Sequence, residues 1–504
     1  MANERFSAHT RNPAAPQARF QHRSTFKLPV LETTAPPTAA RSSGPIARRA
    51  LRAGYADILV IGNGIAGLAA AVESRRYAPD ADILIVTEQN YPTINTPALK
   101  HFGAGLLEVE QLLAYPPGIE RQLGIGIVNL RATRLDTLAR QVHLSEGASL
   151  KYGRLLLATG ARASGLPETC PGRSFDGVMT LHRLEDYLEL RRRLPDVASA
   201  VVIGGGYHAA ETAMLLHHCH VRVTWLIRGG SFLSRMLDEP ASELLLRHIE
   251  RLGVDVRLET EIAGVVGRIG TVVGVVTKDE KFIPCQLVAV CTGTTPAAEL
   301  AQGTGLALNT RHGLKVNNRL QTAVPDVFAA GDVASILDPQ TGRHATRAQW
   351  YAAFQQGRLA AATITGATIP AGAETGVLGC FWHATQLGEL GVVTAGAPML
   401  SEREHRDNEV LTSGSSSYYR RVVVRENRIV GYLAIGTRQP GGLAIKRLID
   451  EQINISEIKR QLLQDDFDVR SFFTRRRLNA LRSGALPAEA PARRAATRRQ
   501  FAFA

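Results

Sequence analysis

Two glycine-rich turns, about 140 residues apart, have the residue types that bind the phosphates of a dinucleotide. The first follows the apolar run DILVIG and places Gly62, Gly64 and Gly67 before the helix-forming segment LAAAVESRR. The first glycine permits a tight turn, the second lets a pyrophosphate approach the backbone, and the third lets helix and strand pack closely. Free N–H groups at the start of that helix would then face the phosphates.

A carboxylate follows the first turn at the distance expected of a ribose ligand. The next apolar run, DILIVTE, ends in Glu88, 26 positions after Gly62. In a dinucleotide site such a carboxylate accepts hydrogen bonds from ribose hydroxyls. The combination of turn, helix and acidic residue therefore predicts a complete binding site rather than an isolated glycine turn.

The second turn repeats the pattern in VVIGGGYHAAE, with Gly204, Gly206 and Ala209. Alanine suits the third position, because only close helix packing is required there. The following run, VRVTWLI, ends in Ile227 and Arg228 with no acidic residue. A guanidinium can pair with a 2′-phosphate, which favours NADPH over NADH at this site. The alternative is that Arg228 is a solvated loop charge, in which case both coenzymes would be accepted.

These turns work only where strands and helices alternate, so the sequence predicts an α/β fold with two Rossmann-like dinucleotide-binding domains. Three further signatures follow the same order along the chain as in a known family. They are YGRLLLATGARA at Tyr152–Ala163, LVAVCTGTTP at Leu287–Pro296 and TAVPDVFAAGDVA at Thr322–Ala334. With the two turns, these residues resemble the flavoprotein reductases related to the pyridine nucleotide–disulfide oxidoreductases.

The resemblance implies FAD at the first turn and NADPH or NADH at the second, with hydride passing from the nicotinamide to the flavin. The NAD(P) domain, residues 166–317, would be inserted into an FAD domain made of residues 54–165 and 318–371. Asp332 would hydrogen-bond the ribityl chain of FAD. The other cofactor-binding positions carried over from the resemblance are Ala132, Ala158, Thr159, Gly160 and Gly293.

The segment NYPTINTPALKHFGAG, residues 90–105, stands where disulfide reductases of the family carry a redox-active cysteine pair, and it contains no cysteine. It resembles the corresponding stretch of rubredoxin, ferredoxin and nitrite reductase flavoproteins. His101 occupies the place of the flavin-facing lysine, with Lys100 beside it. Glu211 would pair with one of these two. Tyr207 matches a tyrosine that covers the flavin, although an ordinary packing role is equally open.

The five cysteines show neither C-x-x-C spacing nor metal-ligand spacing with histidine, so no metal site is predicted. Cys285 and Cys291 flank the apolar run QLVAV and are expected to be core thiols. No cysteine is expected to take part in turnover.

Residues 374–468 predict a small C-terminal α+β domain. The stretch YYRRVVVRENRIVGYLAIG reads as two alternating strands joined in a hairpin, and a helical segment follows. In the resembling family such a domain either helps to cover the flavin or forms a dimer, and the sequence leaves both open.

The formal charge of +13 lies in two tails, because residues 1–53 and 475–504 each carry about +7. Both tails are rich in Pro, Ala and Arg and are expected to be disordered. The body between them is nearly neutral. No apolar run is long enough for a membrane span, and a cytoplasmic location is expected. An organelle matrix is the alternative, if the first tail is a transit peptide.

The leading hypothesis is an FAD-dependent NAD(P)H oxidoreductase that passes electrons to a separate acceptor. That acceptor would be an acidic rubredoxin- or ferredoxin-like carrier, or a nitrite or nitrate reductase partner. One alternative is an NAD(P)H oxidase or quinone reductase. Another is a flavoprotein of the apoptosis-inducing-factor type whose basic tails bind nucleic acid.

Overall fold

The structure, a computed structural model, describes residues 42–482 except 235, 310, 338–341, 370–378, 401–403 and 439–440. Its first sheet has the order β1-β4-β3-β2-β7-β6-β5, and β20 pairs with residues 155–157 of β7 on the edge opposite β2. The strands are β1 (Ser42–Ser43), β2 (Tyr55–Ile61), β3 (Ile83–Val86), β4 (Gly126–Val128), β5 (Ala132–Asp136), β6 (Gln141–Leu144), β7 (Ser149–Leu157) and β20 (Val327–Ala329). Strands β4, β3, β2, β7 and β20 are parallel to their neighbours within this set, as a dinucleotide-binding sheet requires.

Helix α2 (Ile65–Tyr77) follows β2 and packs against α8 (Trp350–Thr365). The contact is close because small residues meet. A Cβ placed on Gly357 of α8 would lie 2.3 Å from the carbonyl oxygen of Ala66 in α2. Two helices that are far apart in the sequence therefore pack into one core.

The second parallel sheet, β12-β11-β10-β16-β9, carries the second glycine turn. Its strands are β9 (Val178–Thr180), β10 (Ser199–Ile203), β11 (Arg222–Leu226), β12 (Asp255–Arg257) and β16 (Leu287–Val290). Its helices are α5 (Leu184–Arg193), α6 (Tyr207–His218) and α7 (Glu239–Arg251). A small antiparallel sheet of β13 (Ile262–Arg268), β14 (Thr271–Thr277) and β15 (Phe282–Pro284) is attached to it.

The chain returns to the first core earlier than residue 317, the expected end of the NAD(P) segment. Strands β8 (Ala161–Ala163) and β17 (Thr294–Pro296) pair with each other as the chain leaves and re-enters. Leu306, Leu314 and Val316 are already buried in the first core. A further sheet there has the order β18 (Leu308–Asn309), β19 (Gly313–Val316), β21 (Ala334–Leu337) and β22 (His344–Thr346).

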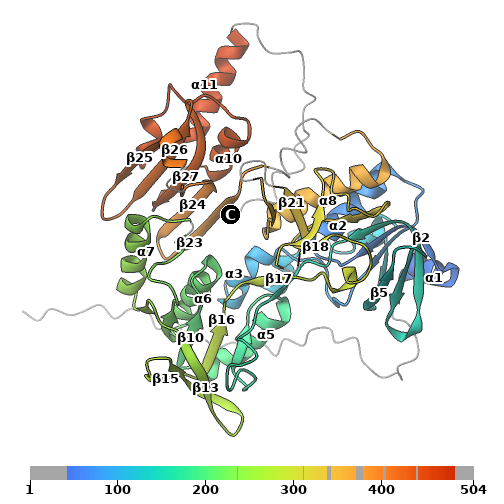
Figure 1. The fold of residues 1–504 in the computed structure, drawn as a ribbon, viewed down its shortest axis with the longest axis horizontal. Coiled ribbons are helices and arrows are strands. Elements are labelled where there is room, and N and C mark those ends of the chain that lie inside the picture. Colours follow the sequence, from blue (N-terminus) through green and yellow to red (C-terminus); the bar gives the residue numbers. More distant parts are fainter. Residues whose placement is uncertain are drawn as a thin grey trace, which may run out of the picture. The chain divides into compact units, whose positions relative to one another are not determined.

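The C-terminal sheet is antiparallel, with the order β23-β24-β27-β26-β25 (Figure 1). Its elements are β23 (Trp382–Leu387), β24 (Leu390–Gly396), β25 (Glu409–Gly414), β26 (Tyr419–Arg425), β27 (Arg428–Gly436), α10 (Gly442–Asp450) and α11 (Val469–Arg482). The expected hairpin is β26–β27, whose two turn residues Glu426 and Asn427 both have positive φ angles.

Two segments expected to be disordered are helical. Residues 44–53 form α1, which buries Ala47 and Ala50 against the first core. At the other end, α11 extends to Arg482, well past the expected boundary at 475. The tail hypothesis failed at these positions because composition does not show which small residues a neighbouring sheet will bury. Residues 1–41 and 483–504 of the two tails lie outside the described residues. Among the described helices, none is long and apolar enough to cross a membrane.

Candidate active site

One cavity of about 2750 Å³ is lined by both glycine turns. Gly62 and Gly64 of the first turn and Gly206 of the second all contribute to its wall. Residues of the C-terminal sheet close another part of it, including Trp382 and Thr385. The two predicted nucleotide sites therefore open into a shared space.

In the first turn, a side chain at two of the glycines would clash with the backbone, and a side chain at the third would fill open space where a ligand can bind. Gly62 has a φ of +108°, and a Cβ on it would lie 2.3 Å from the carbonyl oxygen of Ala158. A Cβ on Gly67 would lie 2.0 Å from the carbonyl oxygen of Gly62. Gly67 therefore permits close helix packing and does not line the cavity. A Cβ on Gly64 would meet nothing within 4 Å, so its backbone is open to a ligand.

Glu88 lies on the cavity wall with its side chain 48% exposed and Oε1 3.3 Å from Nε of Arg131. Its carboxylate is accessible to a hydroxyl, as a ribose ligand must be. The other positions carried over for the first site also line the cavity, namely Ala132, Ala158, Thr159 and Gly160.

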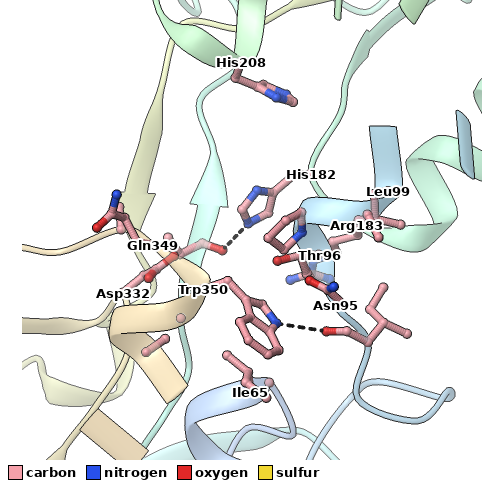
Figure 2. Close-up of a pocket in the computed structure, with 18 of the residues that line it drawn as sticks. Ile65, Asn95, Thr96, Leu99, His182, Arg183, His208, Asp332, Gln349 and Trp350 are labelled. Carbon is pink, nitrogen blue, oxygen red and sulfur yellow. Dashed lines mark hydrogen bonds between the residues drawn. The ribbon is translucent and has the colours of Figure 1, made fainter. Parts of the chain in front are cut away.

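Asp332 offers a test of whether this chain suits a flavin nucleotide. It lines the cavity directly before β21, and Figure 2 shows it among Gln349, Trp350 and His182. Its carboxylate receives no hydrogen bond from the described part of the chain. Burial raises its pKa above the ordinary value, and the nearby His182 only partly opposes that shift. An unpartnered acceptor in a cavity wall fits a ligand that brings hydroxyl donors.

The second turn is built like the first. Gly204 has a φ of +143°, and a Cβ on it would lie 2.2 Å from the carbonyl oxygen of Cys291. Ala209 is fully buried against the sheet. Gly206 and Gly293 line the cavity, and a Cβ on either would meet nothing within 4 Å. As in the first turn, packing and ligand space are divided among different positions.

Arg228 does not line the cavity. Its side chain is 84% exposed, and its nearest carboxylate oxygen is Oε1 of Glu261 at 3.9 Å. That carboxylate also pairs with Lys278. Arg228 is therefore an exposed side chain beside an acidic residue, and the expected preference for NADPH stays a prediction.

Lys100, and not its neighbour His101, forms the ion pair with Glu211. Nζ of Lys100, in α3 (Leu99–Gly103), lies 2.6 Å from Oε1 of Glu211, and the side chains are 23% and 16% exposed. His101 is exposed and lines the cavity without joining the pair. Thr385 of β23 donates a hydrogen bond to the same Glu211 oxygen and accepts one from Lys100 at 3.3 Å.

The pKa of Glu211 reflects two opposing effects. Burial alone would raise it, but the Lys100 ammonium and the hydrogen bonds from Lys100 and Thr385 lower it below the ordinary value. The carboxylate is therefore ionised at neutral pH and fixes a positive charge inside the cavity. Partial desolvation of the imidazole and the neighbouring Lys100 lower the pKa of His101, so that this side chain is uncharged at neutral pH.

Sequence reasoning missed the contribution of β23. His383 stacks on Tyr207 with ring centroids 4.0 Å apart and an interplanar angle of 28°. Burial lowers the pKa of His383 to about 4. His383 and Thr385 share one face of β23. The sequence pattern of this strand does not distinguish them from residues that only pack in the core. The only signal was that both residues are polar.

The cysteines agree with their expected place in the core. Cys285 and Cys291 are buried, and all five cysteines are free thiols. Cys291 lines the cavity, but burial raises its thiol pKa to about 12. Within the described residues, no group of histidine, cysteine and carboxylate side chains is placed to hold a metal ion.

Two parallel-sheet dinucleotide turns that share one cavity with a partly buried Lys–Glu pair define a two-nucleotide oxidoreductase. Residues 56–357 match the model of the pyridine nucleotide-disulphide oxidoreductase family, and the chain belongs to that family. It is an NAD(P)H-dependent oxidoreductase that uses FAD and NAD(P)H.

Known proteins of this kind match over most of their lengths. A rubredoxin-NAD(+) reductase of Ectopseudomonas oleovorans is 29% identical over 62% of this chain and 81% of its own length. The ferredoxin–NAD(+) reductase component of the biphenyl dioxygenase system of Paraburkholderia xenovorans is 33% identical over 55% of this chain and 67% of its own length. The structure of a covalent putidaredoxin reductase–putidaredoxin complex superposes with a TM-score of 0.74 and 25% identity, covering 83% of this chain and 98% of that one.

Proposed function

We propose that this protein takes electrons from NAD(P)H and passes them through FAD to a separate small iron–sulfur protein. The shared cavity carries the proposal, because both nucleotide turns reach it and the partly buried Lys100–Glu211 pair lies within it. Burial raises the pKa of the thiol on its wall, Cys291, to about 12, so the thiol is protonated at neutral pH and we assign it no part in the transfer.

The residues of the first site divide the binding of FAD. Gly64 opens the backbone to the pyrophosphate, Glu88 accepts from the adenosine ribose, and Asp332 accepts from the ribityl hydroxyls. When bound, FAD supplies the hydride acceptor and the store from which electrons leave. Lys100, held by Glu211, keeps a fixed positive charge in the cavity and needs no reorganisation when negative charge develops there.

The second site positions the nicotinamide coenzyme. Gly206 and Gly293 leave room for the coenzyme, and the N-terminus of α6 faces its phosphates. Tyr207, the next residue along the wall, lies where the coenzyme must pass to reach the Lys100–Glu211 pair. Hydride transfer between the two sites then requires only that the reacting rings be held in contact.

An acidic carrier suits the basic helix α11. Arg470 of this helix lines the cavity, and Arg475, Arg476 and Arg477 are exposed further along it. The helix itself contains no acidic residue. Opposite charge on a carrier would increase its rate of encounter with this face and make that rate sensitive to salt.

The test is a single-turnover electron transfer. The FAD-loaded protein is reduced anaerobically with one equivalent of NADH or NADPH and mixed separately with a rubredoxin, a [2Fe–2S] ferredoxin, benzoquinone and air-saturated buffer. We expect reoxidation to be fastest with one of the two carriers and to slow as salt rises. Faster reoxidation by quinone or oxygen than by either carrier would replace this function with the quinone reductase or oxidase alternative.

A further inference from the structure

The residue spacing along helix α6 matches that along strand β23, and the role that we infer from this match rests on the proposed function. Tyr207 and Glu211 are four residues apart and share one face of α6. His383 and Thr385 are two residues apart and share one face of β23. Four helical residues advance about 6 Å and two strand residues about 6.6 Å, so the two pairs can meet in register. They do meet, because His383 stacks on Tyr207 while Thr385 hydrogen-bonds Glu211.

The C-terminal sheet contacts Tyr207 from more than one side. Its ring lies against the imidazole of His383, and its hydroxyl is 3.4 Å from Oγ1 of Thr394 in β24. The edge of the ring faces Phe232 of the loop after β11, with centroids 6.4 Å apart. Two of these three contacts therefore come from a domain other than the one that carries Tyr207.

Tyr207 is the first residue of α6 after the second glycine turn, and it stands between that turn and Glu211. A coenzyme whose pyrophosphate binds at Gly206 must extend past the Tyr207 ring to approach the Lys100–Glu211 pair. Displacing the ring breaks its stack with His383. The free energy of that stack is therefore subtracted from the free energy of coenzyme binding.

We propose that His383 is a positioning residue of the nicotinamide site, which holds the Tyr207 ring in the cavity and so makes the C-terminal domain set how readily the coenzyme enters. His383 is suited to this role because its Nε2 is buried without a hydrogen-bond partner among the described residues. The imidazole is also uncharged at neutral pH, since burial lowers its pKa to about 4. It therefore acts on Tyr207 as a neutral flat ring.

The experiment follows flavin reduction in the FAD-loaded protein by anaerobic stopped flow, with NADH and NADPH as separate probes. His383→Ala should lower the apparent Kd of the coenzyme by about two- to tenfold, the value of one stacked pair, and leave the limiting reduction rate near that of wild type. His383→Phe keeps an aromatic face and should restore the wild-type Kd. In a Tyr207→Ala background, His383→Ala should have no further effect.

His248→Ala is the matched control. His248, in α7, packs against the turn between β23 and β24 and, like His383, has a buried Nε2 without a partner among the described residues, but it does not line the cavity. It should leave the Kd unchanged. If His383→Ala does not retain FAD, His383→Leu fills the volume without a π face and should give the same fall in Kd.

Three results would overturn the proposal: an unchanged or higher Kd in His383→Ala, an effect that persists without Tyr207, or an equal effect of His248→Ala. Failure of the proposed function looks different: in the wild-type protein, either neither coenzyme would reduce the flavin, or quinone or oxygen would reoxidise it faster than either carrier, and neither result involves His383.

Discussion

Replacing Asp332 should move FAD affinity and apoprotein stability in opposite directions. The carboxylate has no hydrogen-bond partner among the described residues and lies in the cavity wall, so its best partners are the hydroxyls of the ligand. A hydrogen bond to a charged acceptor contributes about 1.5–3 kcal/mol, so Asp332→Ala should raise the Kd for FAD by about 10- to 100-fold. Asp332→Asn keeps a neutral acceptor, and its Kd should rise by about tenfold.

The same substitutions should stabilise the apoprotein at neutral pH. Because burial raises the pKa of Asp332 from its ordinary value of 3.8, the folded state keeps this proton when the unfolded state has lost it. Wild-type apoprotein therefore loses stability as pH rises from about 3.8 through the raised pKa, and the variants do not. The measurements are FAD titration by fluorescence quenching and the apoprotein Tm between pH 3.5 and pH 8.

Asp326→Asn is the control from the same motif. Asp326 pairs with Arg140 at 2.7 Å and Arg154 at 2.9 Å and lies outside the cavity. Its substitution should lower the apoprotein Tm and leave FAD affinity unchanged. This role of Asp332 would be contradicted if Asp332→Ala bound FAD as tightly as the wild-type protein. It would also be contradicted if the Asp332→Ala apoprotein had a lowered Tm, as is expected of Asp326→Asn.

Three further outcomes are expected. Cys291→Ser should retain NAD(P)H:ferricyanide activity, because burial raises the thiol pKa to about 12 and leaves no thiolate at neutral pH, and loss of activity with FAD still bound would contradict this. The sequence favours NADPH, which requires the exposed Arg228 side chain to contact the 2′-phosphate. Arg228→Ala should then raise the KM for NADPH far more than the KM for NADH. Equal effects on both coenzymes would show that Arg228 does not bind the phosphate. Glu211→Gln should destabilise the protein at pH 7 by breaking the pair with Lys100, by up to about 3 kcal/mol at this partial exposure. Because the pKa of Glu211 is lowered in the folded state, the stability advantage of the wild-type protein should shrink as pH falls below about 4.5. The measurement is the thermal unfolding of both proteins from pH 3.5 to pH 7. A stability difference that stays constant over this range would contradict the expected role of the pair.

The glycine turns were predictable because their physical requirements are local. A tight turn after a buried strand needs a positive φ angle, and Gly62 and Gly204 both have one. Close packing of helix on strand needs a small third residue, and Gly67 and Ala209 meet that need without lining the cavity. Each of these conditions involves residues within a few positions of one another.

The ion pair between Lys100 and Glu211 was only partly predictable from the sequence. Glu211 was expected to meet either Lys100 or His101, and adjacent helical residues point about 100° apart, so only one of them can face α6. Which one depends on how α3 is rotated, and that is set by packing far away in sequence. His383 and Thr385 were missed for the same reason, since the contact between β23 and α6 spans more than 170 residues.

The insertion of one nucleotide domain into the other has a consequence for synthesis of the chain. Strand β7 ends at Leu157, but its neighbour β20 begins only at Val327, so residues 155–157 of β7 stay unpaired on the edge opposite β2 while about 170 residues are made. At about 5–20 residues per second, this interval lasts roughly 10–35 s on the ribosome. The second parallel sheet, from β9 to β16, is complete within the interval and can fold as a unit. During that time the open edge of β7 is exposed to mispairing, and a chaperone would have its greatest effect on the nascent first domain.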